Sequence, residues 1–155
     1  MAKDKYTILD RWFEEVWNAG NADLIDDMIA PECIAHGLDS PDGKPVKGPE
    51  DFKKFFTDFR AAFPDIRITV QETVSEDDLV VAYCAIDATH TGAAFGMQAT
   101  GKPIHFEGTL MFRVRNGKAV EAWNSFDFLK MFQQMGVVRM GAGQVRFLPA
   151  HFSHV

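Results

Sequence analysis

The sequence has little of what several common classes of protein need. Its two cysteines, Cys33 and Cys84, lie far apart in 155 residues, with no CxxC pair and no cysteine and histidine spacing of the kind that binds zinc. We therefore expect buried, reduced thiols and no disulfide framework. No run approaches the ~18 apolar residues of a membrane-spanning helix, and the N-terminus lacks the apolar stretch of a secretion signal. These features predict a cytoplasmic protein.

Basic charge is also scarce. Sixteen Lys and Arg stand against 22 Asp and Glu, a formal net charge of −6. Because nucleic acids and anionic membranes require a clustered basic face, we expect neither as a partner. The five histidines show neither HExxH nor His-x-x-x-His spacing, so we predict no metal and no cofactor. No GxSxG motif is present, which leaves nucleophilic hydrolysis without support.

The chain is rich in apolar and aromatic residues. Hydrophobic residues make up 46% and include 14 Phe, and the length suffices for one domain with a full core. Five of these Phe recur at helical spacing between Pro49 and Pro64: Phe52, Phe55, Phe56, Phe59 and Phe63. Such a stripe must face an apolar surface, either packed core or the wall of a cavity.

The order of the elements predicts the fold class. Helical patterns cover residues 4–19, 22–29 and 49–63, and residues 40–48 have the composition of a loop. Four strand patterns then follow, at 66–74, 79–91, 104–115 and 119–128. Helices first and long neighbouring strands later indicate an α+β fold with a mostly antiparallel sheet.

The last two strands flank Asn116-Gly117, the signature of a tight hairpin turn. A regular ladder sets Arg115 opposite Lys118, Leu110 opposite Trp123 and Phe106 opposite Asp127. The apolar face would then hold one carboxylate, Asp127, whose pKa would rise toward the range useful for proton exchange. A one-residue bulge would undo this pairing.

An alternative for Asp127 follows from its position. Asp127 immediately precedes a helical pattern over residues 128–135, and aspartate commonly caps the first turn of a helix through its side chain. Spacing alone leaves the capping role and the catalytic role open.

Several motifs between residues 16 and 136 resemble the SnoaL-like polyketide cyclase and ester cyclase family, part of the group with the nuclear-transport-factor-2 fold. The matching segments are Asn18-Ala19-Gly20-Asn21, Ala62-Phe63-Pro64-Asp65, Thr89-His90-Thr91-Gly92, Ala99-Thr100-Gly101-Lys102, Arg113, Asn116-Gly117-Lys118, Val120-Glu121, Trp123, Asp127 and Gln134-Met135-Gly136.

This resemblance implies a cone: a strongly curved sheet wrapped over three N-terminal helices, with an apolar cavity between them. It further implies a homodimer and a cofactor-free cyclase that acts on an apolar small molecule. The cyclase would remove a proton α to a carbonyl and close a ring by intramolecular aldol addition. The expected domain spans residues 1–136, and residues 137–155 form an extension that packs on the body or on a partner subunit.

The resemblance also suggests the site. Asp127 matches the family's acid/base, and we rank His36, His90 and His105 as its possible partners. The candidates for substrate contact are Trp12, Phe56, Phe59, Phe106, Leu110 and Trp123. Three other functions stay open on the same fold: a non-catalytic binding or structural dimer module, a ketosteroid-isomerase-like isomerase, and an epoxide hydrolase.

Overall fold

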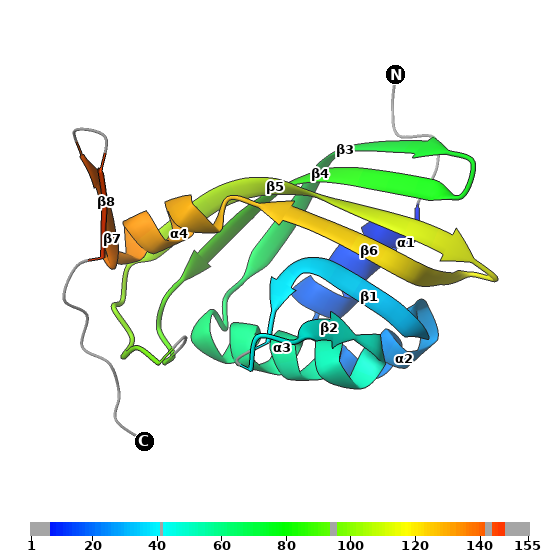
Figure 1. Cartoon of the computed structure of the whole chain (residues 1–155), viewed down its shortest axis with the longest axis horizontal. Coiled ribbons are helices and arrows are strands. Elements are labelled where there is room, and N and C mark those ends of the chain that lie inside the picture. The colour runs from blue at the N-terminus through cyan, green and yellow to red at the C-terminus, as the bar shows by residue number, and fades with distance from the viewer. Residues whose placement is uncertain (1–6, 41, 94–95, 142–143, 148–155) are drawn as a thin grey trace.

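Six strands form one curved sheet in the order β2-β1-β6-β5-β4-β3, with helices against its concave side (Figure 1). The structure, a computed structural model, describes residues 7–40, 42–93, 96–141 and 144–147. The strands are β1 (Ile29–Asp39), β2 (Pro45–Lys47), β3 (Arg67–Glu76), β4 (Leu79–Thr89), β5 (Pro103–Arg115) and β6 (Lys118–Phe126). Every neighbouring pair is antiparallel except β1 and β6. The predicted α+β class with a mostly antiparallel curved sheet is confirmed.

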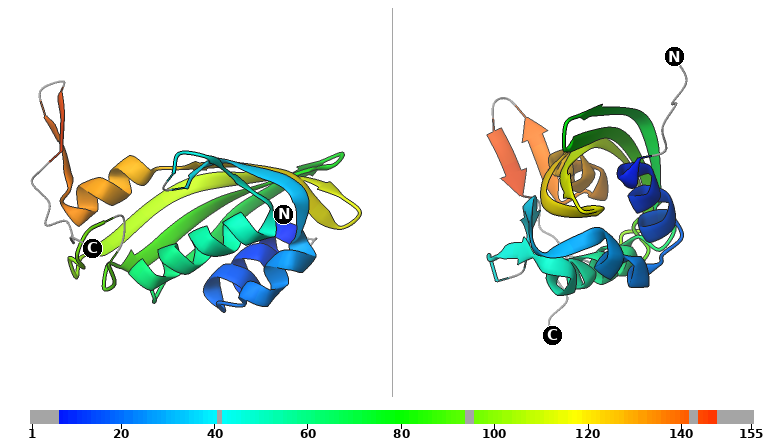
Figure 2. Two further views of the ribbon diagram at one scale, coloured as in Figure 1. Left: turned by 60° about the horizontal axis from the view of Figure 1, so that its bottom comes forward. Right: turned by 90° about the vertical axis from the view of Figure 1, so that its right-hand side faces the viewer.

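Three helical segments from the first part of the chain fill the concave side of the sheet, which wraps around them in Figure 2. They are α1 (Ile8–Arg11) continuing into η1 (Trp12–Asn18), η2 (Ala22–Leu24) continuing into α2 (Ile25–Met28), and α3 (Gly48–Ala62). A reciprocal pair of hydrogen bonds caps α1, because the Thr7 hydroxyl accepts from the Asp10 N–H and the Asp10 carboxylate accepts from the Thr7 N–H. This cap fixes where the first helix starts.

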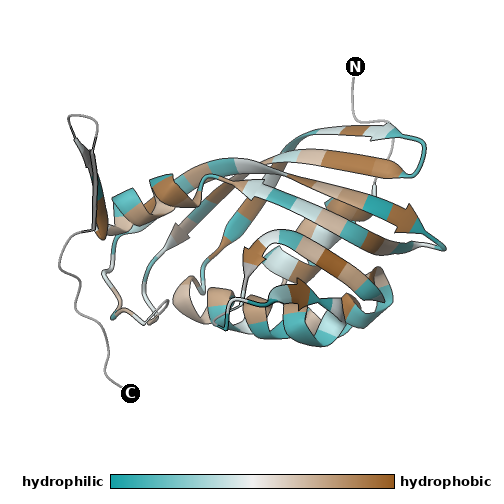
Figure 3. Cartoon of the chain, viewed as in Figure 1, coloured by the Kyte–Doolittle hydropathy of each residue, from teal (hydrophilic) through white to brown (hydrophobic). Residues whose placement is uncertain are grey.

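The interior between sheet and helices is aromatic. Trp12 and Phe13 of η1 meet Phe106 and Phe112 of β5 there, all at most 2% exposed. Along α3 the predicted Phe stripe faces the sheet, and hydrophobic and hydrophilic residues alternate along the strands (Figure 3). This alternation is the pattern of strands with one buried face. The stripe is therefore part core and part cavity wall.

Residues 40–48 were expected to form a loop, and the structure corrects this. Residues 45–47 are strand β2, which pairs with β1 through Val46 opposite Ala35. Pro45 is tolerated because β2 lies at the edge of the sheet, where a residue without an N–H leaves no ladder bond unmade. β1 spans eleven residues and is held on both sides, by β2 and β6.

The hairpin of β5 and β6 contains a one-residue bulge. Arg115 lies opposite Lys118 as predicted, but Val114 pairs with Ala119 while Arg113 pairs with Glu121, so β6 carries one extra residue, Val120. Beyond that point the register shifts by one, and every β6 side chain turns to the face opposite the one expected.

The shifted register overturns two predicted pairs. Leu110 lies opposite Asn124, and Trp123 lies opposite Met111. The predicted pairing of Leu110 with Trp123 is therefore wrong, and so is the pairing of Phe106 with Asp127, because β6 ends at Phe126 opposite Gly108.

Helix α4 (Phe128–Met135) follows β6 and leads to a small hairpin, β7 (Val138–Gly141) with β8 (Gln144–Phe147), at the far end of the molecule in Figure 1. Val138 is buried next to the end of α4. Gly136 ends α4 in the left-handed conformation, and the division of the chain after residue 136 stays a prediction. Residues 148–155, including Phe152, lie outside the described part of the chain, so the packing of the extension stays a prediction.

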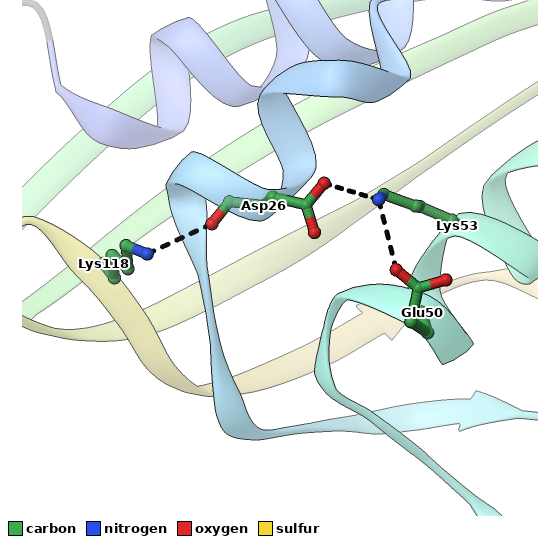
Figure 4. A network of polar contacts seen from close by, with 4 residues as sticks. All are labelled: Asp26, Glu50, Lys53 and Lys118. Carbon is green, nitrogen blue, oxygen red and sulfur yellow. Dashed lines mark hydrogen bonds and ion pairs between the residues drawn. The ribbon is translucent and has the colours of Figure 1, made fainter.

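A surface network joins α2, α3 and the start of β6 (Figure 4). The Lys53 ammonium contacts the carboxylates of Asp26 and Glu50, and Lys118 Nζ donates to the Asp26 carbonyl at 3.2 Å. Exposed ion pairs contribute little each, on the order of 0–1 kcal/mol. Their effect here is to tie the β5–β6 turn to the two helices beneath it.

Gln134 fastens α4 to the sheet. Its Oε1 accepts from the His105 N–H at 2.6 Å and its Nε2 donates to the His105 carbonyl at 2.8 Å. The side-chain amide thus takes the place of a strand neighbour, because β6 has already ended beside this part of β5. Met131 and Met135 on the same helix are fully buried, so the amide and the apolar contacts act together.

We predict that Gln134→Ala lowers the free energy of unfolding by about 1–3 kcal/mol, because it leaves two backbone groups of β5 without partners. Urea denaturation measures the change. The neighbouring Gln133→Ala, at an exposed position, is the control and should alter stability by less than about 0.5 kcal/mol. Equal effects of the two substitutions would contradict the docking role of Gln134.

Candidate functional site

A hollow opens between the concave face of the sheet and the helices. Its volume is about 410 Å³ when counted out to its open mouth. Its wall consists of Trp12, Phe13, Trp17, Leu38, Phe52, Phe55, Phe59, Ile66, Ile68, Ile86, Leu110, Asn124, Phe126 and Phe128. All but one of these side chains are aliphatic or aromatic. We call this space the larger hollow.

A second space of about 290 Å³, the smaller hollow, shares part of that wall. The shared residues are Trp12, Phe52, Leu110 and Asn124, and its other lining residues include Cys33 and Gly48. Asn124 therefore stands where the two spaces adjoin, and it carries the one side-chain amide among the described lining residues.

Asn124 owes this position to the bulge at Val120. Its Nδ2 donates to the carbonyl of His36 on the neighbouring strand β1 at 3.0 Å. An amide has two N–H donors and one carbonyl acceptor, so one donor and the Oδ1 atom remain after that bond. The bond fixes the rotation of the amide, which leaves an oriented polar group against an otherwise apolar wall. Asn124 is not among the residues predicted from the sequence, because a regular register places it on the outer face.

Cys33 does not add a nucleophile to this site. Burial, reinforced by the carboxylates of Glu121 and Glu32, raises the pKa of the Cys33 thiol to about 12. The thiol therefore stays protonated at neutral pH and behaves as a small apolar group. Cys84 is also buried and in no disulfide, so the expectation of buried, reduced cysteines is confirmed.

Asp127 lies outside the hollow. Its side chain is exposed, and its Oδ1 accepts from the Lys130 N–H at 3.0 Å, which makes it the N-cap of α4. The expected setting, a carboxylate enclosed on an apolar sheet face, is therefore wrong. Phe126 and Phe128, on either side of Asp127, both line the larger hollow, so the carboxylate lies next in sequence to two residues of its wall.

The three histidine candidates lie in different places. His36 faces outward, stacks on Trp123 with ring centroids 5.6 Å apart, and contacts Glu121 through Nε2 at 2.7 Å. His105 is on the outer face, and its Nδ1 contacts Asp87 at 2.7 Å. His90 is fully buried behind Phe63. None of the three lines either hollow.

The candidates for substrate contact divide evenly. Trp12, Phe59 and Leu110 line the larger hollow. Phe106 is buried beneath Phe128, Phe56 packs against Trp17, and Trp123 lies on the outer face beside Arg113. Whether any of the six touches a substrate stays a prediction.

The described residues lack a metal-binding cluster and a membrane-spanning helix. They contain no group of three His, Cys, Asp or Glu side chains arranged to hold a metal ion. No helix within residues 7–40, 42–93, 96–141 and 144–147 is long and apolar enough to cross a lipid bilayer.

Comparison with known proteins gives a consistent result. The model of the family described as SnoaL-like polyketide cyclase matches residues 7–135. Among curated proteins, none matches the chain.

Solved structures give many matches. IdmH from Streptomyces antibioticus, a candidate polyketide cyclase, is 32% identical, with a TM-score of 0.71 over 84% of this chain and 96% of IdmH. A candidate polyketide cyclase from Acidithiobacillus ferrooxidans is 29% identical, with a TM-score of 0.70 over 83% of this chain and 92% of its own. AclR from Streptomyces galilaeus, a candidate hydroxylase, shares the fold at 23% identity, with a TM-score of 0.69 over 84% of this chain and 83% of AclR.

The cap geometry of Asp127 gives a prediction that separates its structural role from any chemical one. Asp127→Ala should lower the free energy of unfolding by about 1 kcal/mol, because the first turn of α4 loses its side-chain acceptor. Asp127→Asn keeps an acceptor and should stay close to the parent protein. Thermal unfolding of the two variants checks this, and equal losses in both would show that the charge, not the cap, stabilises α4.

Proposed function

The chain belongs to the SnoaL-like polyketide cyclase family, and from that premise we propose that it binds an apolar, carbonyl-bearing small molecule in the larger hollow and promotes its ring closure. In the reaction a carbon α to one carbonyl loses a proton, and the resulting enolate carbon attacks a second carbonyl of the same molecule. The observation that carries this proposal is an apolar hollow with one oriented amide, Asn124, in its wall.

The shape of the hollow supports an orienting role. Its wall is aliphatic and aromatic with one polar side chain, the usual composition of a small-molecule site. A chain with several carbonyls is flexible in water, and enclosure between Trp12, Phe59 and Leu110 would hold it folded. Effective molarities for well-oriented intramolecular reactions are large, on the order of 10⁵ M or more, so orientation alone can supply much of the acceleration.

Asn124 supports the chemistry in a second way. Its remaining N–H can donate to a substrate carbonyl, and the same bond strengthens when that oxygen takes negative charge as an enolate. The surrounding wall is apolar, and a hydrogen bond beside such a wall is electrostatically stronger than it would be in solution. The amide is held by the His36 carbonyl before any substrate arrives, so little reorganisation is needed.

In the reaction suggested by the sequence, Asp127 accepts the proton from the α-carbon. Its position between Phe126 and Phe128 supports this role, because both neighbours line the larger hollow. Its exposure and its bond to the Lys130 N–H count against it, since a substrate would have to reach the rim. Proton transfer at Asp127 is therefore the step of this proposal that most needs a direct test.

A second candidate function is a non-catalytic binder of the same ligand class. The observation that favours it is the absence of any Asp, Glu, His, Lys or Arg among the described residues of either wall. The isomerase and epoxide hydrolase alternatives gain no support from the geometry. Tyr83 bonds to Glu107 and Arg113 pairs with Asp78, and none of these four residues lines a hollow.

Binding is testable with 9-fluorenone, an apolar aromatic ketone with no ionisable group. In a Trp123→Phe background, emission comes from Trp12 and Trp17, both in the wall, so a ligand in the larger hollow should quench it. Asn124→Leu should weaken binding about fivefold, the worth of one hydrogen bond of about 1 kcal/mol. Ser125→Ala, one residue away and exposed, is the control. An unchanged affinity of Asn124→Leu for 9-fluorenone would show that the amide does not contact the ligand.

Proton abstraction is testable with 2-tetralone in D₂O, by following exchange of its α-hydrogens with NMR. Asp127→Asn keeps the cap of α4 and removes the base, so catalysed exchange should fall to the uncatalysed rate if Asp127 accepts the proton. Exchange at the parent rate in this variant would refute the assignment. Exchange that the parent protein itself fails to accelerate would favour the binder.

The homodimer implied by the family belongs to the same proposal, and the outer face of the sheet supports it. Val74, Val81, Met111 and Trp123 are successive register partners across β3, β4, β5 and β6. Register partners share a face, so these side chains form one apolar row. Val74 is 66% exposed. A second copy of the chain, related by a two-fold axis, would cover this row with its own.

We predict that Met111→Glu shifts the mass in solution from that of two chains to that of one, because it places a charge in the middle of the row. Light scattering after size exclusion measures the mass. Glu72→Lys, exposed on β3 beside the row, is a control for charge on the same face. A parent protein with the mass of one chain would refute the dimer.

A further inference from the structure

His90 has a buried ring whose two nitrogens are in different situations. The residue is 0% exposed. Its Nδ1 faces the Thr100 N–H at 3.2 Å and the Thr100 hydroxyl at 2.9 Å, whereas its Nε2 has no hydrogen-bond partner. A backbone N–H can only donate, so Nδ1 must be the acceptor. The neutral ring therefore carries its proton on Nε2.

The backbone of His90 is hydrogen-bonded to residues 101 and 102, next to Thr100. The His90 N–H donates to the Lys102 carbonyl at 2.9 Å, and the Gly101 N–H donates to the His90 carbonyl at 2.7 Å. Together with the Nδ1 contacts, these bonds close the connection between β4 and β5 at its base. His90 alone thus makes the hydrogen bonds just described, which hold residues 100–102 to the end of β4.

The ring of His90 also lies behind the wall of the larger hollow. It packs on Phe63, at the end of α3, with centroids 5.4 Å apart, and Phe63 packs on Phe59 at 5.0 Å. Phe59 lines the larger hollow. The Gly92 N–H donates to the Ala62 carbonyl, and a Cβ on Gly92 would lie 1.8 Å from the Ala61 carbonyl oxygen. The connection between β4 and β5 therefore packs directly against the end of α3.

We propose that His90 is a positioning residue for the larger hollow: Nδ1 fastens residues 100–102, and this fastening holds the connection, through Gly92, against the end of α3 that carries Phe59 and Phe63. The inference rests on the proposed function, since it concerns the same hollow. His90 itself touches no substrate. Without the Nδ1 contact the connection would be free to shift away from the end of α3, and Phe59 and Phe63 would lose their fixed positions.

Protonation provides a way to release the contact without mutation. A charged ring carries hydrogen on both nitrogens, so Nδ1 would face the Thr100 N–H with a second donor. Burial lowers the pKa of His90, and the Gly92 backbone opposes this shift. Charged groups on neighbouring segments are Lys102, which is exposed, and Asp65, whose carboxylate accepts from the Thr89 N–H; no ion pair joins either to the described ring.

The sign of the pH effect follows from the lowered pKa. The folded protein prefers the neutral ring, so the contribution is complete above the ordinary histidine pKa of about 6.5. It is lost as pH falls through the lower pKa of the folded state. Affinity for a ligand in the hollow should fall over the same range.

Two variants separate the acceptor from the ring. His90→Asn keeps an acceptor near the place of Nδ1 and gives up the ring, while His90→Phe keeps the ring and gives up the acceptor. We expect the dissociation constant for 9-fluorenone at pH 7.5 to be near the parent value in His90→Asn and about fivefold higher in His90→Phe, the worth of one buried hydrogen bond. The parent protein should lose affinity below pH 6.5, and both variants should lack that loss.

A purely structural ring gives the reverse result. If packing alone mattered, His90→Phe would match the parent and His90→Asn would bind more weakly, and that outcome overturns the proposal. An affinity of the parent protein that stays constant between pH 7.5 and the acid limit of folding also overturns it. Circular dichroism and thermal unfolding ensure that each variant is compared in its folded state.

Amide hydrogen exchange keeps this test separate from the proposed function. If the parent protein fails to bind 9-fluorenone, the proposed function fails, yet exchange in residues 96–102 and 55–63 must still be faster in His90→Phe than in His90→Asn. Equal exchange in the two variants refutes the fastening. Should His90→Phe not fold, His90→Leu, which also lacks an acceptor, takes its place, and equal exchange in His90→Leu and His90→Asn has the same consequence.

Discussion

The one-residue bulge in β6 determines which side chains line the hollow. Because successive side chains of a strand point to opposite faces, the extra residue Val120 turns Asn124 inward and Trp123 outward. A regular ladder from the same turn would have reversed both, with an indole in the wall and the amide on the outer face. The chemistry available inside the hollow, and the apolar row available outside it, are two results of one insertion.

Amide side chains complete the structure wherever the sheet lacks a neighbour. Asn18 exchanges two hydrogen bonds with Ile68 of β3, and Gln134 does the same with His105 of β5. Asn124 donates to the His36 carbonyl of β1. Each amide satisfies a backbone group that would otherwise be unpaired and locates the element that carries it. The hollow is therefore framed by polar contacts at its edges, while its wall stays apolar.

Much of the fold was predictable because it rests on local patterns. The Phe spacing in α3 and the turn at Asn116-Gly117 are strong signals, and both are confirmed. The register was not predictable from residues 118–126, because a bulge at a residue such as Val120 leaves no mark in composition. The wrong register also gave a wrong site, because it placed Trp123 in the wall and Asn124 on the outer face. Sequence spacing left open whether Asp127 caps α4. Its bond from the Lys130 N–H shows that it does.

The placement of ionisable groups sets what the hollow can do. Asp127 caps α4 at the rim, His36 and His105 hold carboxylates on the outer face, and His90 is enclosed behind Phe63. Burying a charge in an apolar wall without a partner is costly, and the described wall avoids that cost by containing none. In the proposed reaction a substrate inside would meet an apolar wall and one amide, and any proton would be exchanged outside the hollow. Such a wall would restrict the conformation of a flexible poly-carbonyl chain through one fixed hydrogen bond, without a buried charge.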